Sequence, residues 1–255
     1  MSTLAISLIV FGCIFGGTLL GMLLQRLLPK HHLSDRSLDV VKLGTGMLAT
    51  LAALVIGLLI SSARANFDTM RNELISTSSN IILLDRLMAQ YGPETKDARD
   101  LLRLTVAAAI KRIWSEERME YTYAKSFDKR VSGMEALQEK LLRLSPQDRA
   151  QRWLQSRALQ VSGDLAAERW LLAQQIGLSS LPMPFFVILV SWLVIIFFNF
   201  GLSSSPNATV IIVLLICALS SAASLYLIQE LDRPYGGLIT ISSEPLRDAL
   251  TVLTQ

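Results

Sequence analysis

The residues of this 255-residue sequence that could do chemistry are few, and their spacing fits no common catalytic site. The two histidines, His31 and His32, are adjacent and lie near Asp35 and Asp39. Because adjacent side chains point in different directions and no further soft ligand is near in sequence, we expect a solvated loop here and no metal. The HExxH, GxxxxGK[ST], GxSxG and GxGxxG motifs do not occur. We therefore predict no catalytic residue and no cofactor, and expect the protein not to be an enzyme.

A second cluster of chemically capable residues is acidic and lies near the C-terminus: Glu230, Asp232, Glu244 and Asp248. Oxygen-rich groups bind calcium, but the spacing is not that of an EF-hand loop. The interpretation that we favour is structural. Glu230 and Asp232, together with Arg233, anchor the end of one helix, while Glu244 and Asp248 occupy the first turn of another.

The charged residues are segregated along the chain, and this segregation predicts which elements position the clusters. No charged residue precedes Arg26, none lies between Lys42 and Arg64, and none lies between Trp170 and Gln229. A helix of about 20 apolar residues crosses a hydrocarbon core about 30 Å thick, so we predict four transmembrane helices, at residues 4–24, 43–63, 184–202 and 208–228. The lipid bilayer is therefore the first expected partner. The first span lacks a basic start and exceeds a signal peptide's apolar length, so we expect it to stay in the mature protein.

The polar segment between the second and third spans predicts an extramembrane helical domain. It holds 18 of the 24 basic and 15 of the 21 acidic residues. Apolar residues at 3,4 spacing from Phe67 to Tyr91 predict a stem that continues the second membrane helix until Gly92 and Pro93. Further helices are predicted at residues 93–114, 132–144, 146–177 and 245–253, with an irregular stretch around residues 121–131.

These predictions define an all-α, polytopic membrane protein with four transmembrane helices and a helical extramembrane domain. We assign residues 1–63 to the first two spans and their loop, and residues 64–177 to a helical domain. Residues 178–229 form the last two spans, and residues 230–255 form a tail. No segment is basic enough to indicate binding to nucleic acid.

Small residues recur at four-residue spacing in the first two spans. The first span contains the pairs Gly12 with Gly16 and Gly17 with Gly21, and the second contains Thr45, Ala49, Ala53, Gly57 and Ser61. Small side chains let membrane helices approach closely. Two interpretations stay open, namely packing within one four-helix bundle and a tight subunit interface in a homo-oligomer.

The second span also offers candidate pore-lining residues. If the small residues pack inward, then Thr50, Leu54 and Leu58 lie on a different face, which meets either lipid or a central pathway. A ring of leucines around a pathway would gate it by dewetting. The spans contain no aspartate, glutamate, lysine, arginine or histidine, which argues against an ion-coupled carrier and leaves open a passive pore for ions.

Two stretches of the sequence resemble a known family. Residues 37–46 read SLDVVKLGTG, and residues 230–237 read ELDRPYGG. With two spans, a charged helical insert, two further spans and this tail in order, the chain resembles the bestrophin-like family of bacterial membrane proteins, which is distantly similar to bestrophin anion channels. The tail residues that carry the resemblance are Glu230, Asp232, Arg233, Pro234 and Gly237.

The resemblance implies a homo-oligomer, a pentamer as in bestrophins, that forms a passive anion channel lined by the second helix. It also implies the bacterial inner membrane, with both termini and residues 64–177 in the cytoplasm. The second span has no phenylalanine where bestrophins place an aromatic neck, and the tail lacks the consecutive acids of the animal calcium clasp, so no bestrophin functional residue carries over. The alternative is a membrane-anchored interaction or regulatory protein whose helical domain recruits a partner.

Overall fold

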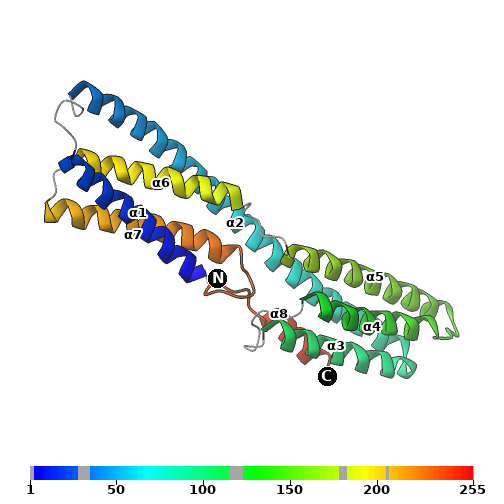
Figure 1. The fold of residues 1–255 in the computed structure, drawn as a ribbon. Helices are drawn as coiled ribbons and strands as arrows, with labels where there is room; N and C mark the ends of the chain where they lie inside the picture. The colour runs from blue at the N-terminus through cyan, green and yellow to red at the C-terminus, as the bar shows by residue number, and fades with distance from the viewer. Residues whose placement is uncertain (1–2, 28–34, 115–122, 178–182, 205–206, 255) are drawn as a thin grey trace. The chain divides into compact units, whose positions relative to one another are not determined.

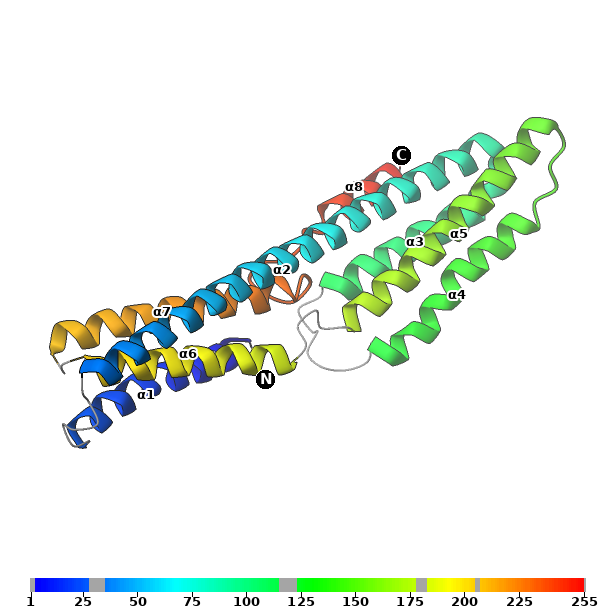
Figure 2. The same ribbon diagram turned by 90° about the horizontal axis from the view of Figure 1, so that it is seen from above.

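The computed structural model describes residues 3–27, 35–114, 123–177, 183–204 and 207–254, and all regular elements in these ranges are helical (Figures 1 and 2). In chain order they are α1 Thr3–Leu27, α2 Asp35–Tyr91, the 3₁₀ turn η2 Pro93–Thr95, α3 Lys96–Trp114, α4 Tyr123–Leu142, α5 Arg149–Gly177, α6 Met183–Ser203, α7 Ala208–Leu231 and α8 Glu244–Val252. Within the described ranges, α1, the stretch Asp39–Tyr91 of α2, α6 and α7 are long and apolar enough to cross a membrane. The predicted all-α class with four spanning helices is confirmed.

The chain divides into two compact units. The membrane unit comprises Met1–Phe67 with Ser179–Ile239, and the helical unit comprises Asp68–Leu178 with Thr240–Gln255. Helix α2 contributes its first part to the membrane unit and its second part to the helical unit, as the continuous 3,4 pattern predicts. The tail is shared as well, because residues 230–239 belong to the membrane unit and α8 belongs to the helical unit.

In the membrane unit α1 packs against α6 and α7 (Figures 1 and 2). The contact with α6 depends on glycines, because a Cβ atom on Gly21 would overlap the Phe198 carbonyl oxygen and lie 2.9 Å from the Leu202 nitrogen. A Cβ atom on Gly201 of α6 would in turn overlap the Thr18 carbonyl oxygen. The two backbones therefore approach as closely as they do because neither carries a side chain at the crossing.

In the helical unit α4 packs against α3 and α5, and α3 also packs against α8. Its core contains fully buried side chains from four helices, namely Leu84, Leu102, Leu137, Leu141 and Leu165. These positions are the apolar faces that helical periodicity predicts.

Two predicted boundaries in the helical unit are wrong. Helix α4 begins at Tyr123, so the stretch predicted to be irregular up to residue 131 is helical. Between residues 123 and 132 the chain contains no proline and no glycine, and its lysines, arginine and alanine are good helix formers. Helix α5 begins at Arg149 and not at residue 146, because the Asp148 carboxylate accepts a hydrogen bond from the Gln151 backbone N–H at 2.7 Å and caps the helix.

Candidate functional site

The candidate site is the face of α2 that the membrane unit leaves open. On the inner face Thr45, Ala52 and Ala63 are buried, while the outer face carries exposed apolar side chains over the same stretch. Leu54 is 61% exposed and Leu58 is 63% exposed in the single chain. Within its apolar window α2 is 11% buried, compared with 22–28% for the other three spans. Helix α2 is therefore the span with the most surface left for lipid, water or another subunit.

One polar contact fixes which face of α2 turns inward. The Asn199 side-chain amide of α6 donates a hydrogen bond to Thr45 Oγ1 at 3.0 Å, and Thr45 Oγ1 donates to the Val41 carbonyl at 2.7 Å. An unpaired amide inside a membrane is costly, so this pair favours one rotation of α2 about its axis. With Thr45 facing α6, Thr50 and Leu54 point away from it.

The small residues of α2 do not share one face in the structure. Thr45 is buried and Ala49 is half-buried, whereas Ala53, Gly57 and Ser61 are exposed. The reason is geometric: four residues turn the helix by about 400°, so a four-residue repeat drifts by about 40° at each step. The repeat therefore begins inside the membrane unit and ends on the open face, beside Thr50, Leu54 and Leu58.

The glycine pairs of α1 also separate. Gly21 is buried and Gly17 is half-buried against α6, with the Val194 carbonyl oxygen 3.2 Å from a Cβ atom built on Gly17. Gly12 and Gly16 are exposed, and a Cβ atom on either would meet nothing within 4 Å. The structure thus uses one pair for packing within the chain and leaves the other pair on an open surface.

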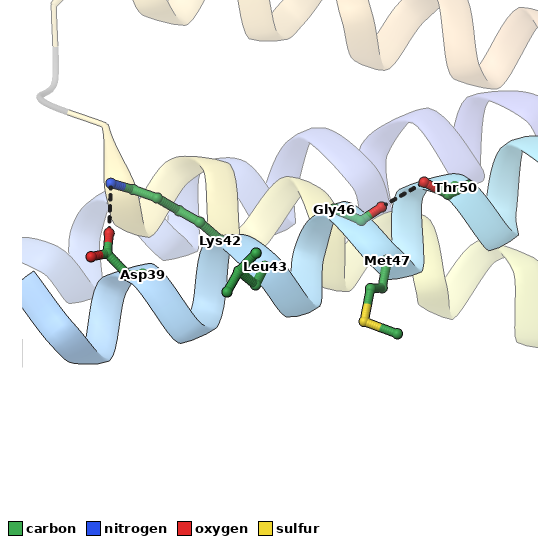
Figure 3. Close-up of a pocket in the computed structure, with 6 residues that line it drawn as sticks. All are labelled: Asp39, Lys42, Leu43, Gly46, Met47 and Thr50. Carbon is green, nitrogen blue, oxygen red and sulfur yellow. Dashed lines mark hydrogen bonds and ion pairs between the residues drawn. The ribbon is translucent and has the colours of Figure 1, made fainter.

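A shallow groove with polar ends lies at the beginning of the open face (Figure 3). At one end Lys42 forms an exposed ion pair with Asp39, with 3.7 Å between Nζ and Oδ1. At the other end the Thr50 hydroxyl donates to the Gly46 carbonyl at 2.9 Å. Along the open face of α2, the charged pair therefore comes first, the Thr50 hydroxyl follows, and Leu54 and Leu58 come after it. The groove is lined by Asp39, Lys42, Leu43, Gly46, Met47 and Thr50.

The family-motif tail folds closely around a buried carboxylate at the end of α7. Glu230 is only 3% exposed. Its Oε1 accepts a hydrogen bond from Thr3 Oγ1 of α1 at 3.1 Å, and its Oε2 accepts one from the Leu238 backbone N–H at 2.8 Å. Glu230 thus joins the start of α1, the end of α7 and the following turn, because a buried carboxylate needs several donors.

The other motif residues build the turn that reaches Glu230. The Arg233 backbone N–H donates to the Glu230 carbonyl at 3.0 Å, while the Arg233 side chain is exposed. Pro234 is buried and Asp232 is half-buried. A Cβ atom on Gly237 would overlap Glu230 Oε2, so any larger residue there would have to displace the Glu230 carboxylate. The motif that carries the resemblance is therefore a structural joint of the membrane unit.

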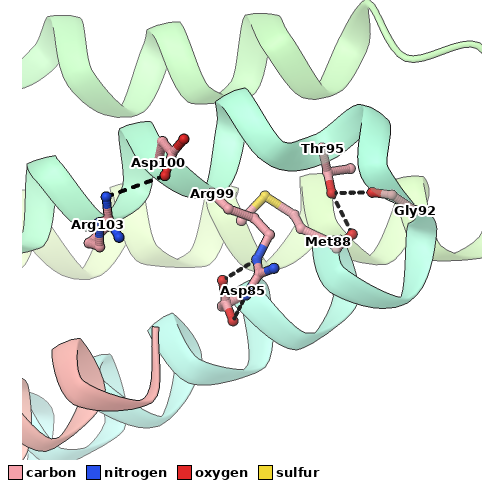
Figure 4. Close-up of polar contacts among 7 residues, drawn as sticks. All are labelled: Asp85, Met88, Gly92, Thr95, Arg99, Asp100 and Arg103. Carbon is pink, nitrogen blue, oxygen red and sulfur yellow. Dashed lines mark hydrogen bonds and ion pairs between the residues drawn. The ribbon is translucent and has the colours of Figure 1, made fainter. Parts of the chain in front are cut away.

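In the helical unit polar pairs hold α2 to its neighbours. Asp85 of α2 is 1% exposed and accepts two hydrogen bonds from Arg99 of α3, at 2.7 and 3.0 Å (Figure 4). The hydrogen bond to Asp85 is the main cause that raises the pKa of Arg99. Closer to the start of this part of α2, Glu168 of α5 accepts hydrogen bonds from Thr77 at 2.8 Å and from Asn80 at 2.9 Å. These contacts fix α3 and α5 on the second part of α2.

Sequence reasoning missed the pairs that lock α2, namely Thr45 with Asn199, Asp85 with Arg99, and Glu168 with Thr77. The one signal for the first was a lone amide, Asn199, in an otherwise apolar span. His31 and His32 lie outside the described residues. Among the residues that the structure describes, no group of three or more histidine, cysteine, aspartate or glutamate side chains is placed to hold a metal ion.

Comparison with protein families identifies the family to which this chain belongs. The model of the Bestrophin-like domain matches residues 12–246, which include most of the first span, the other three spans, most of the helical unit and the tail motif. The chain belongs to the bestrophin-like family. Nothing among the curated proteins and nothing among the solved structures matches it significantly. This bestrophin-like chain, with its four spanning helices, is an integral membrane protein whose spans contact the lipid bilayer.

Proposed function

We propose that this bestrophin-like protein is a homo-oligomeric, passive ion channel that conducts anions and is lined by α2. In this proposal it lies in the inner membrane of a bacterium, with both termini and the helical unit in the cytoplasm. The observation that carries it is the open face of α2. The membrane unit holds the inner face through the Asn199–Thr45 hydrogen bond and leaves Thr50, Leu54 and Leu58 uncovered.

The chemistry of the open face suits a narrow passive pathway. Thr50 and Ser61 bring hydroxyls to this face, and Gly57 between them adds no side chain that would narrow a pathway. No charged residue lies between Lys42 and Arg64, so no fixed charge would trap a permeating ion at mid-membrane. Rings of Leu54 and Leu58 from several subunits would form an apolar constriction that closes by dewetting. Selectivity would then come from the width of the pathway and from charges outside the membrane.

The proposal is tested by measuring ion flux from liposomes that contain the purified protein. We expect chloride efflux above that of empty vesicles, with little potassium efflux. Leu54→Ser should raise chloride flux, because a hydroxyl would let water wet the constriction. The matched control is Leu8→Ser on α1, since Leu8 is 68% exposed and lies on another helix. Leu8→Ser should leave flux unchanged.

Two results would contradict the proposal. One is the absence of flux above empty vesicles for every ion and voltage tested. The other is an equal response to Leu54→Ser and Leu8→Ser, which would mean that the open face of α2 meets lipid like the face of α1. Either result would favour the membrane-anchored interaction protein.

A further inference from the structure

One exposed face of the helical unit combines arginines with a tryptophan. Between Arg149 and Gly163, α5 carries three arginines and no acidic residue. Arg149, Arg152 and Arg157 are exposed, and Trp153 between them is 63% exposed. Among the described residues none of these three arginines forms an ion pair with a carboxylate. Arg152 donates to the Asp148 backbone carbonyl, and Arg157 donates to the Gln160 amide oxygen.

An uncovered tryptophan flanked by arginines is the composition of a protein–protein contact. Tryptophan and arginine are enriched where protein surfaces meet, and also among the few residues that contribute most to the binding energy there. We call the surface formed by Arg149, Arg152, Trp153 and Arg157 the basic face.

A second exposed face has the complementary composition and lies on α3. Asp97, Asp100 and Leu104 follow one another at i, i+3 and i+7, which places them on one side of the helix. Asp97 and Asp100 are exposed, and Leu104 is 65% exposed. Glu94, in η2 immediately before α3, is also exposed. We call this surface, Glu94, Asp97, Asp100 and Leu104, the acidic face.

Two carboxylates of the acidic face form only weak ion pairs within the chain. Asp100 lies 3.5 Å from Arg103, as Figure 4 shows, and Asp97 lies 3.8 Å from Lys140. All four of these side chains are between 44% and 85% exposed. Exposed pairs at such distances are weak, so a better-placed cation replaces them easily. The carboxylates are therefore available to a partner.

Both faces lie at the same end of the helical unit. Helix α2 ends at Tyr91, and η2 and α3 follow directly. The Thr95 hydroxyl donates to the Gly92 carbonyl at 2.8 Å and stabilises the turn between α2 and α3 (Figure 4). The start of α5 reaches the same end, because the Gln151 side-chain amide donates to the Tyr91 carbonyl at 3.0 Å. Each face extends about 12 Å along its helix from this end, at 1.5 Å per residue.

We propose that the helical units of neighbouring copies of this chain contact each other head to tail, the basic face of one copy on the acidic face of the next. The occupant is a second copy because the chain itself presents the complement: three arginines face three carboxylates, and Trp153 faces Leu104. Because the two faces occupy the same 12 Å of the unit, subunits at one height around an axis bring them together. The inference rests on the homo-oligomer of the proposed function and names its cytoplasmic contact.

The charges also restrict how two copies can meet. A basic face pairs poorly with a second basic face, since like charges placed opposite each other repel. A contact that pairs either face with itself is therefore disfavoured, and the head-to-tail contact uses two different surfaces. Contacts of this kind close into rings when the rotation between subunits permits.

Cross-linking of the full-length protein in detergent tests the contact. The residues to replace are exposed neighbours that leave both faces intact: Ser156→Cys on α5 and Ala108→Cys on α3, in a chain with Cys13→Ser and Cys217→Ser. With a short bismaleimide the double variant should form covalent multimers, while each single variant should not. The control pair joins Ala108→Cys to Ser79→Cys, an exposed position on α2, and should give no multimers.

Charge reversal separates this contact from general unfolding. Arg149→Glu with Arg152→Glu should lower the yield of multimers by about ten-fold, because it places acids opposite acids. Adding Asp97→Arg and Asp100→Arg to the same chain should restore the yield, since both faces then have exchanged their signs. A damaged fold would not be rescued by two further substitutions.

Each remaining outcome overturns the inference. If light scattering shows an oligomer but the Ser156→Cys/Ala108→Cys pair forms no multimers, the contact is wrong and the proposed function stands. If multimers form from Ser156→Cys alone, the contact is two-fold and the head-to-tail arrangement is wrong. If the protein is monomeric at every concentration, both the contact and the homo-oligomer fail, and chloride flux then decides separately whether a channel exists.

Discussion

The crossing of α1 and α6 gives the sharpest prediction about the membrane unit, because Gly21 has no room for a methyl group. In Gly21→Ala the new Cβ atom would lie 2.9 Å from the Leu202 nitrogen and closer still to the Phe198 carbonyl oxygen. Ordinary contacts need at least 3.4 Å, so the two helices must separate locally. Overpacking of this kind costs about 1–3 kcal/mol. The better helix propensity of alanine returns at most about 1 kcal/mol.

If the full propensity gain is subtracted, the net loss for Gly21→Ala relative to the parent is about 0–2 kcal/mol. Relative to Gly12→Ala, which gains the same propensity without the clash, the loss is about 1–3 kcal/mol, or about 2–12 °C in Tm for a chain of this size. The measurement is thermal unfolding of the purified protein in detergent. Gly12→Ala is the matched control, since nothing lies within 4 Å of its Cβ position on the same helix. Its Tm should equal or exceed that of the parent. Equal Tm values for Gly21→Ala and Gly12→Ala would refute the close approach of α1 and α6.

Three further predictions concern the tail and the helical unit. Gly237→Ala should displace the Glu230 carboxylate and lower the free energy of unfolding by about 1–3 kcal/mol. Amide hydrogen exchange over residues 236–239 should become faster, and unchanged exchange would contradict the packing of this turn on Glu230. Asp85→Asn should weaken the paired hydrogen bonds to Arg99 and lower the stability of the helical unit by about 1.5–3 kcal/mol, read by hydrogen exchange in α3. Burial, helped by two nearby carboxylates, raises the pKa of Tyr91 above its ordinary value of 10.0. The stability that neutral Tyr91 contributes is therefore complete below pH 10 and is lost as the pH rises through the folded-state pKa. Tyr91→Phe should reduce this loss of stability at alkaline pH, measured by urea unfolding.

The membrane fold was readable from the sequence because charge segregation is a strong signal. Each of the four predicted spans lies inside a helix of the structure. The stem was equally readable, since α2 continues to Tyr91 as the 3,4 spacing predicts. The start of α4 was missed. Tyr123, Phe127 and Val131 recur there at four-residue spacing, but this short pattern precedes the stronger capping signal of Ser132 and Glu135, which predicted a later start.

The arrangement of the candidate site could be predicted only in part. The resemblance pointed to α2 and to the tail, but the roles within them depend on contacts between distant residues. Asn199 and Thr45 are 154 residues apart, and Thr3 and Glu230 are 227 residues apart. No local pattern indicates such pairs. The sequence predicted a structural role for Glu230 at a helix end, but its partners, and the rotation of α2, appear only in three dimensions.

The most direct test of the central claim, that the open face of α2 lines an ion pathway, is block of chloride flux by a charged thiol reagent at position 50. In a Cys13→Ser/Cys217→Ser chain, Thr50→Cys should react from water in liposomes, and a negatively charged thiosulfonate should then abolish most of the flux. Ile212→Cys, on an exposed face of α7, is the control and should be insensitive. Flux that survives complete modification of position 50, or that falls equally at position 212, would contradict the account.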